Sequence, residues 1–271
     1  MNREPIRYFV VDAFTDRPFS GNPAAVVPLR KWQKDAWLQN VAMEMNLSET
    51  AFFVPEDHGF HLRWFTPRVE VDLCGHATLA AAFVIAQSGL QPVGSDIQFS
   101  TRSGTLNASW QQDRVQLDFP LKPESSTEPP IELLQGLAIR PAYVGRNEFD
   151  YLVEVESETE VRELVPDFKR LAEVDCRGVI VTSRSNDPRF DFVSRFFGPA
   201  VGVDEDPVTG SAHCCLADFW RKRMKKDTLV AFQASARGGV VDLTVRQDRV
   251  LLTGDAVVVA CGELLIESTM S

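Results

Sequence analysis

Three ionisable side chains lie at points of the sequence where proton transfer could occur. Glu49 follows Ser48 at the start of the apolar run TAFFV, where burial would raise the pKa of a carboxylic acid toward the useful range. His76 is of a residue type that titrates near neutral pH and donates hydrogen bonds to ligands. Asp206, in the acidic stretch DEDP, can act as a base or accept a hydrogen bond from a substrate amine or hydroxyl. Each also has a plain structural interpretation: a surface acid, a helix-start histidine or a turn residue.

Two glycines open the segments that are expected to position these groups. Gly75 and Gly210 each begin a predicted helix and are followed by His76 and Ser211. A helix N-terminus exposes unpaired N–H groups and the positive end of the dipole, so it binds carboxylates and phosphates well. The alternative is that the glycines only permit tight turns and that Ser211 caps its helix.

The sequence contains the same pattern twice. LRWFTPRVEVD (62–72) aligns with SRFFGPAVGVD (194–204), and TRSGTLNASWQQDRVQL (101–117) aligns with ARGGVVDLTVRQDRVLL (236–252). Between the two matches, the second copy has a longer loop before its helix, and this loop contains Asp206. Similarity that resumes after one insertion indicates two homologous halves, each of ordinary domain size. The alternative is that both are common hairpin sequences. With a duplication, two equivalent helix starts could face one ligand.

Both halves have the composition of short strands around one helix. Residues 77–86 are apolar on every side, which predicts a fully buried helix, and residues 209–224 form its equivalent, with basic residues at its end. The strand candidates are rich in aromatic and β-branched residues and suggest mostly antiparallel meanders. They are residues 6–14, 50–54, 60–65, 96–100, 105–110 and 114–119 in the first half, and 151–155, 178–182, 190–197, 239–245, 249–254 and 256–262 in the second. The expected domains are residues 1–119 and 131–266, joined by a Pro-rich linker at 120–130.

Composition excludes several functional classes. The 271 residues carry a formal charge of -10 at pH 7, which disfavours nucleic acid and anionic membranes as partners. No signal peptide or membrane-spanning segment is visible, so a cytoplasmic location is expected. Five cysteines without framework spacing are expected to be reduced thiols.

Metal and nucleotide sites are not expected either. His213, Cys214 and Cys215 are consecutive, so on a helix they point in different directions and cannot converge on one metal ion. No Gly-rich phosphate loop follows a predicted strand. The sequence therefore predicts neither a metal nor a nucleotide cofactor.

Four segments resemble the phenazine-biosynthesis isomerase family (PhzF-like), which is similar in fold to diaminopimelate epimerase: DAFTDRPFSGNPAAVV, NLSETAFF, FTPRVEVDLCGHATLAAA and VDEDPVTGSAHC. The resemblance implies an α+β fold of two pseudo-symmetric domains. Each would be a barrel-like, mostly antiparallel sheet around a central α-helix, with the active site in the cleft between them. It also implies a cofactor-free homodimer acting on a small carboxylic acid; the best-understood member isomerises trans-2,3-dihydro-3-hydroxyanthranilate.

By resemblance, Glu49 is the proton shuttle, which removes a proton from one carbon of a bound acid and returns it to another. The resemblance also implies the substrate-binding residues Ser48, Gly75, His76, Asp206, Gly210 and Ser211.

The epimerase relatives place one catalytic cysteine on each side of the substrate. Cys74 occupies the first position here, whereas Asp206-Pro207-Val208 occupies the second, so the two-thiol mechanism is broken. A single carboxylate suits an allylic shift, because inversion of a carbon generally needs groups on opposite faces. The alternatives are a two-base epimerase that uses Cys74 and Asp206, and a non-catalytic metabolite- or partner-binding protein.

Overall fold

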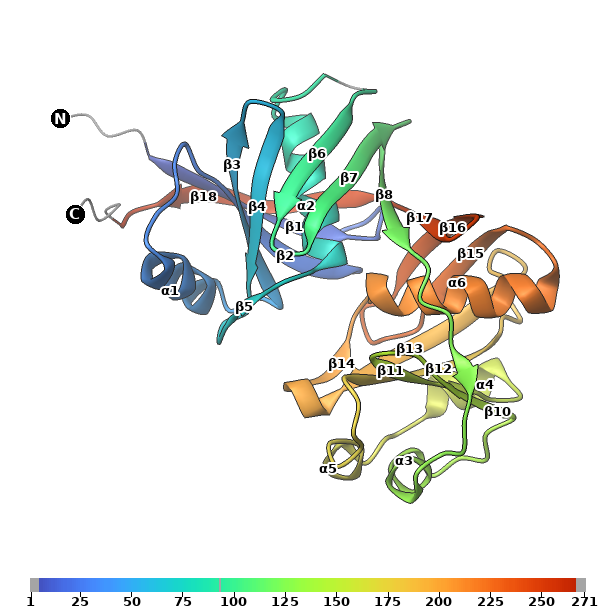
Figure 1. Cartoon of the computed structure of the whole chain (residues 1–271). Helices are drawn as coiled ribbons and strands as arrows, with labels where there is room; N and C mark the ends of the chain where they lie inside the picture. Colours follow the sequence, from blue (N-terminus) through green and yellow to red (C-terminus); the bar gives the residue numbers. More distant parts are fainter. Residues whose placement is uncertain (1–4, 93, 267–271) are drawn as a thin grey trace. The chain divides into compact units, whose positions relative to one another are not determined.

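A computed structural model describes residues 5–92 and 94–266, which divide into two compact units. The first unit comprises the chain up to Asp118 together with the C-terminal segment from Thr253, and the second comprises Phe119–Leu252. Within the described residues, no helix is long and apolar enough to cross a membrane. Each unit is described by itself below (Figure 1).

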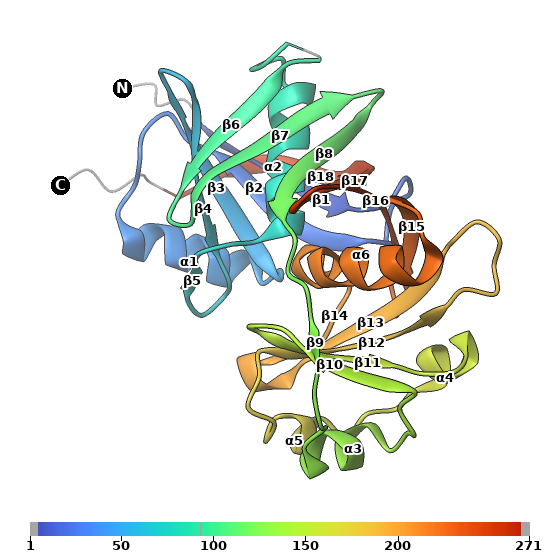
Figure 2. The same cartoon turned by 45° about the vertical axis from the view of Figure 1, so that its right-hand side comes forward.

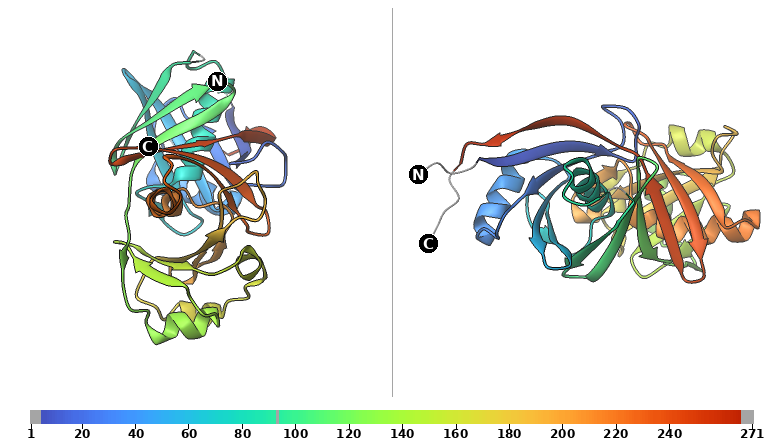
Figure 3. Two further views of the ribbon diagram at one scale, coloured as in Figure 1. Left: turned by 90° about the vertical axis from the view of Figure 1, so that its right-hand side faces the viewer. Right: turned by 90° about the horizontal axis from the view of Figure 1, so that it is seen from above.

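The first unit is a sheet that curves around one buried helix (Figure 3, right). Helix α2 (Gly75–Gln87) is buried at every residue from His76 to Ala86 and packs against β1, β2, β3, β7 and β18. This confirms the helix that the all-round apolar segment predicts. The elements of this unit are β1 (Ile6–Ala13), β2 (Asn22–Pro28), α1 (Asp35–Met45), β3 (Glu49–Glu56), β4 (Gly59–Phe65), β5 (Glu70–Val71), α2, β6 (Asp96–Thr101), β7 (Gly104–Gln111), β8 (Arg114–Pro120) and β18 (Ala256–Leu264).

The second unit has its own buried helix, α6 (Gly210–Met224), whose residues Ala212 to Trp220 are buried and whose last turn is basic. Helix α6 lies on one side of the sheet, and three short helices lie on the other (Figures 1 and 2). The elements are β9 (Ser125–Ser126), α3 (Ile131–Leu137), β10 (Tyr143–Arg146), β11 (Asp150–Glu154), α4 (Glu158–Glu163), α5 (Phe168–Leu171), β12 (Gly178–Arg184), β13 (Phe192–Gly198), the 3-10 turn η1 (Pro199–Val201), β14 (Val203–Asp206), α6, β15 (Thr228–Gln233), β16 (Gly239–Arg246) and β17 (Arg249–Gly254).

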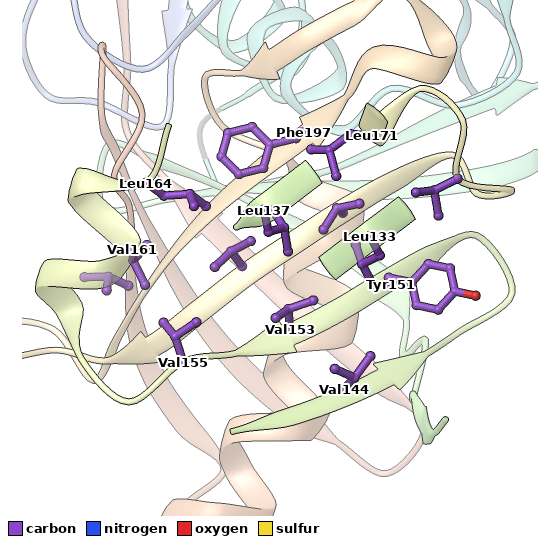
Figure 4. Packing of buried hydrophobic residues seen from close by; sticks show 14 residues of the cluster. Leu133, Leu137, Val144, Tyr151, Val153, Val155, Val161, Leu164, Leu171 and Phe197 are labelled. Atoms are coloured by element: carbon purple, nitrogen blue, oxygen red, sulfur yellow. The ribbon is translucent and has the colours of Figure 1, made fainter. Parts of the chain in front are cut away.

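The face of the second sheet away from α6 carries a continuous apolar cluster (Figure 4). Leu133 and Leu137 of α3 and Leu171 of α5 pack onto alternating side chains such as Val153 and Val181 of the sheet. Because successive strand residues point to opposite faces, these strands bury one face under the short helices and the other under α6.

The strand order repeats between the units. In the first, β2 and β3 are parallel, β3 and β4 antiparallel, β4 and β6 parallel, and β6 and β7 antiparallel. In the second, β11, β12, β13, β15 and β16 repeat this sequence of parallel and antiparallel pairs. The repeated topology supports the duplication that the sequence indicates. The two parallel pairs in each unit differ from the expected meanders, because parallel neighbours need long crossovers such as α1 and α2.

The structure divides the chain differently from the expected boundaries 1–119 and 131–266. Strand β18 pairs with β1 from Ile6↔Leu264 to Ala13↔Ala256, so the C-terminal strand belongs to the first unit. The expected linker at 120–130 belongs to the second unit, where β9 pairs with β10. Strand pairing between the chain ends, which no local pattern reports, causes the difference.

Candidate active site

Three element starts converge in the first unit. Asn22 is the first residue of β2, Glu49 is the first residue of β3, and Cys74 is the N-cap of α2, directly before Gly75 and His76. The parallel pairing of β2 with β3, in register at Ala24↔Glu49, places the starts of the two strands close together, with Asn22 two residues before the partner of Glu49. Helix α2 packs against both strands, which brings His76 to the same place.

A chain of short polar contacts joins these residues. Nε2 of His76 lies 3.1 Å from Oε2 of Glu49, and Nδ1 of His76 lies 3.1 Å from Nδ2 of Asn22. The hydroxyl of Ser48 donates to Oδ1 of Asn22 at 3.2 Å, and Sγ of Cys74 lies 3.5 Å from Nδ1 of His76. Asn22 is fully buried, whereas the Glu49 side chain is 19% exposed, so solvent or a ligand can reach the carboxylate.

The contact between His76 and Glu49 is close but not aligned. Although the two atoms are 3.1 Å apart, neither Nε2 of His76 nor Oε2 of Glu49 has a hydrogen bond of good angle within the described residues. Buried polar atoms are normally hydrogen-bonded, so both atoms have an unused capacity to form a hydrogen bond, for example with a ligand. Catalytic hydrogen bonds are often poorly aligned until a ligand is bound.

Burial and the charge of Glu49 oppose each other at the histidine but act together on the thiol. Burial lowers the pKa of His76, whereas the negative charge of Glu49 raises it. Burial raises the pKa of Cys74, and the charge of Glu49 raises it further. Cys74 is therefore a neutral thiol at neutral pH, and Glu49 is the charged group that Nε2 of His76 faces.

Glu49, Cys74 and His76 form one cluster of potential metal ligands, with donor atoms within 4.8 Å of one another. Ligands on one tetrahedral zinc ion, with bonds of about 2.0–2.3 Å, stand only about 3.3–3.8 Å apart. The nearest neighbours of Glu49 and Cys74 are different ring nitrogens of His76, and a metal ion takes one nitrogen. The cluster is therefore not a preformed metal site, and the absence of a metal stays a prediction.

The second unit contains the remaining predicted residues. Helix α6 begins at Gly210, followed by the half-buried Ser211, and its N-cap Thr209 donates from its hydroxyl to Oδ2 of Asp206 at 2.6 Å. Gln233 ties this loop down, because its side chain donates to the carbonyl of Asp206 at 2.7 Å and accepts from N–H of Thr209 at 2.8 Å. The N-cap hydroxyl thus binds the aspartate rather than the first turn of the helix, which has no side-chain cap.

The position equivalent to Glu49 in the second unit is Gly178. Thr50 pairs with Phe65 in the first unit and Val179 pairs with Phe197 in the second, and the two phenylalanines are aligned in the repeat. The residue before Thr50 is therefore equivalent to the residue before Val179.

Gly178 could not be replaced by a residue with a side chain unless the ring of Phe196 moved. A Cβ added there would lie 2.2 Å from Cζ of Phe196, so an aromatic ring occupies the space. The preceding Arg177, equivalent to Ser48, makes a bidentate ion pair with the buried Asp150. The two halves are thus chemically unequal at this position, because only the first copy has an acid at the strand start.

The structure brings together the predicted residues Ser48, Glu49, Cys74, Gly75 and His76 in the first unit, and Asp206, Gly210 and Ser211 in the second. Sequence reasoning missed Asn22. Its signal was the turn SGNP before an apolar run, but an asparagine beside glycine and proline usually indicates only a turn.

Comparison with known proteins agrees with this architecture. A family model described as phenazine biosynthesis-like protein, PhzC-PhzF, matches residues 11–262. An uncharacterized isomerase of Halalkalibacterium halodurans is 52% identical over 259 residues, covering 95% of this chain and 98% of that protein. The crystal structure of a PhzF-family phenazine biosynthesis protein from Enterococcus faecalis is 40% identical, with a TM-score of 0.93, and covers 97% of this chain and all of that one.

A more distant structure shows how far the fold extends. A probable proline racemase from Agrobacterium radiobacter has a TM-score of 0.64 at 10% identity, covering 97% of this chain and 93% of that one, which is a likeness of fold alone. The two-unit α+β fold is therefore shared with racemase-like proteins, whereas sequence identity places the chain more narrowly. The chain is an isomerase and belongs to the PhzC-PhzF family of phenazine biosynthesis-like proteins.

Proposed function

We propose that this isomerase moves a proton between two carbons of a small unsaturated carboxylic acid that bears an amino or hydroxyl group, with Glu49 as its single shuttling base and without a cofactor. The observation that carries the proposal is the position of Glu49. Its carboxylate is partly exposed and lies 3.1 Å from Nε2 of the buried His76. A base needs both access to its substrate and a fixed orientation.

The chemistry balances with one carboxylate. Glu49 takes a proton from one carbon, the electron pair of that C–H bond forms a new double bond, and the existing double bond shifts. The Glu49 carboxylic acid then returns the same proton to the carbon at the far end of the shifted system. His76, with Nε2 toward Oε2, stabilises the carboxylate in the states where the proton is on the substrate.

Two observations favour a single base over a pair. The second unit has Gly178 and the ring of Phe196 where the first has Glu49. The pKa of Cys74 is raised by burial, which keeps this thiol protonated and leaves little thiolate to act as a base at neutral pH. One base on one face suits a proton shift along the substrate better than inversion at one carbon.

The test is isomerisation in deuterated water, followed by proton NMR, on a panel of unsaturated amino and hydroxy acids that begins with trans-2,3-dihydro-3-hydroxyanthranilate. Glu49→Gln should lower turnover about 10²–10⁴-fold, the usual contribution of general acid–base catalysis, while ligand affinity is kept. Glu44→Gln, an exposed glutamate on α1, is the matched control and should be unchanged. Equal turnover in the wild type and Glu49→Gln would remove Glu49 from the mechanism.

The two-base epimerase has one observation in its favour, since Cys74 lies 3.5 Å from an imidazole nitrogen that could take its proton. The same NMR experiment separates the two reactions. A moved double bond supports the shift, whereas solvent deuterium incorporated with inversion at one carbon supports Cys74 and Asp206 as a pair.

Further parts of the proposal come from the family resemblance. Ser48, Gly75 and His76 in the first unit, and Asp206, Gly210 and Ser211 in the second, are proposed as substrate-binding residues. A homodimer and a cytoplasmic location also stay predictions. Sedimentation equilibrium and cell fractionation, respectively, check them.

A further inference from the structure

Cys74 lies in two surroundings that normally activate a thiol. It is the N-cap of the buried helix α2, and its sulfur lies 3.5 Å from Nδ1 of His76. A helix N-terminus and a neighbouring imidazolium are both arrangements that lower the pKa of cysteine. Nevertheless the pKa of this thiol is raised, by burial and by Glu49. The other contacts of Nδ1 decide whether the thiol can pass its proton to the imidazole.

The carboxamide of Asn22 occupies that nitrogen. Nδ2 of Asn22 lies 3.1 Å from Nδ1 of His76, and an amide NH₂ group can only donate. With the amide in this orientation, Nδ1 can accept the hydrogen bond only in the tautomer that carries its proton on Nε2. The hydroxyl of Ser48, which donates to Oδ1 of Asn22 at 3.2 Å, holds the amide in the orientation that points NH₂ at the ring. Asn22 has no exposed surface, so water does not compete.

We propose that Asn22 is a positioning residue that confines the ring proton of His76 to Nε2, facing Glu49, and so keeps Cys74 protonated and leaves Glu49 as the base. The catalytic part of this inference rests on the proposed function; the part about Cys74 does not. The proton balance is simple: in the suppressed state, the thiol proton of Cys74 moves to Nδ1, giving a thiolate and an imidazolium, and the Asn22 N–H must leave Nδ1.

Few other charges act on this group. The strands that pack on α2 are β1, β2, β3, β7 and β18, and β2 and β7 contain no titratable side chain. Strand β3 contributes Glu49 here. On β18, Cys261 and Glu263 are exposed; on β1, Arg7 is exposed, Tyr8 is half-buried, and the buried Asp12 accepts from N–H of Phe19 at 2.8 Å. The balance between thiol and imidazole is therefore decided among Asn22, Cys74, His76 and Glu49.

The experiment needs no substrate. Alkylation of Cys74 by iodoacetamide is followed by peptide mass spectrometry between pH 6 and 10, together with thiolate absorbance at 240 nm. In Asn22→Ala, Nδ1 is open to the thiol proton, so Cys74 should be alkylated about tenfold faster, or more, at pH 7.5; each unit by which the thiol pKa falls raises the thiolate fraction about tenfold. The 240 nm absorbance of the same variant in a Cys74→Ser background is subtracted, which isolates the contribution of the Cys74 thiolate.

A matched variant separates the proposal from a mere loss of packing. In Asn22→Asp, the carboxylate accepts a hydrogen bond from Nδ1–H and adds negative charge beside the sulfur, so Cys74 alkylation should stay at or below the wild-type rate. Ser48→Ala, which frees the amide to turn, should accelerate alkylation less than Asn22→Ala does. Circular dichroism verifies folding of each variant.

The inference is overturned if folded Asn22→Ala and Ser48→Ala both leave the pH dependence of Cys74 alkylation unchanged, or if Asn22→Asp accelerates alkylation as much as Asn22→Ala. If Asn22→Ala does not fold, Ser48→Ala decides alone. Failure of Glu49→Gln to lower turnover would refute the proposed function and leave this thiol result standing, so the two can be told apart.

Discussion

His213 should make the protein lose stability in mild acid. Its ring is fully buried on α6, one turn after the N-cap. Nδ1–H donates to the carbonyl of Thr209 at 2.8 Å, and Nε2 has no partner within the described residues. The ring of Phe192 lies 6.3 Å from it, so a proton added at Nε2 would enter apolar surroundings. Burial accordingly lowers the pKa of His213 from 6.5 to about 4, and the bond to Thr209 offsets only part of this effect.

The direction and magnitude of this loss of stability follow from proton linkage. Because the folded pKa lies below the unfolded pKa, the unfolded state binds more protons in acid, and stability falls with falling pH. The contribution is complete above pH 6.5 and is lost as the pH falls from 6.5 toward 4. At 1.36 kcal/mol for each pKa unit, the loss is about 2 kcal/mol at pH 5 and about 3 kcal/mol below pH 4.

Urea unfolding at pH 8 and pH 5 measures this loss in the wild type and in His213→Leu. At pH 8 the free energy of unfolding of the variant should be lower than that of the wild type by about 1 kcal/mol, because the hydrogen bond to Thr209 is lost. Its further loss on going to pH 5 should be about 2 kcal/mol smaller than that of the wild type. His58→Gln, in the exposed turn between β3 and β4, controls for histidine content. An equal pH 5 to pH 8 difference in the wild type and His213→Leu would refute the reasoning.

Two further predictions concern the second unit. Arg177→Met should lower the free energy of unfolding by about 3 kcal/mol, because it leaves the buried carboxylate of Asp150 unpaired, whereas the double variant Asp150→Met/Arg177→Met should lose markedly less. Urea unfolding of both variants would show the reverse order if the pair did not matter. Asp206→Asn should raise KM about tenfold with a smaller effect on kcat if this aspartate is a substrate-binding group, and steady-state kinetics with an identified substrate would count against that role if KM were unchanged.

Local patterns were sufficient for several elements of this protein. The all-round apolar run before Gln87 predicted a buried helix because a helix enclosed by a sheet has no wet face. The two copies of the Arg-aromatic-Pro pattern indicated the duplication, and the repeated strand pairing has the same origin. Glu49 was a candidate base because burial at the entrance to an apolar strand would raise the pKa of a carboxylic acid toward the range useful for proton transfer.

The parallel pairs and the domain boundaries needed the tertiary structure. Strand β18 joins the first unit because it pairs with β1 at the other end of the chain, and alternation of apolar residues carries no information about which strand lies next to which. The same holds for the pairing of Asp150 with Arg177, which neutralises the equivalent strand start in the second unit.

The sequence alone therefore determined the duplicated α+β plan, the two helix starts and the acid beside the first of them. Only the tertiary structure decided which groups contact the imidazole of His76. It placed Asn22, which lies 54 positions earlier in the chain, against Nδ1 of His76, and it placed the sulfur of Cys74 against the same nitrogen. Hydrogen-bond partners of a buried imidazole depend on distances of a few tenths of an ångström between distant segments. Residue type and spacing along the chain cannot specify such distances.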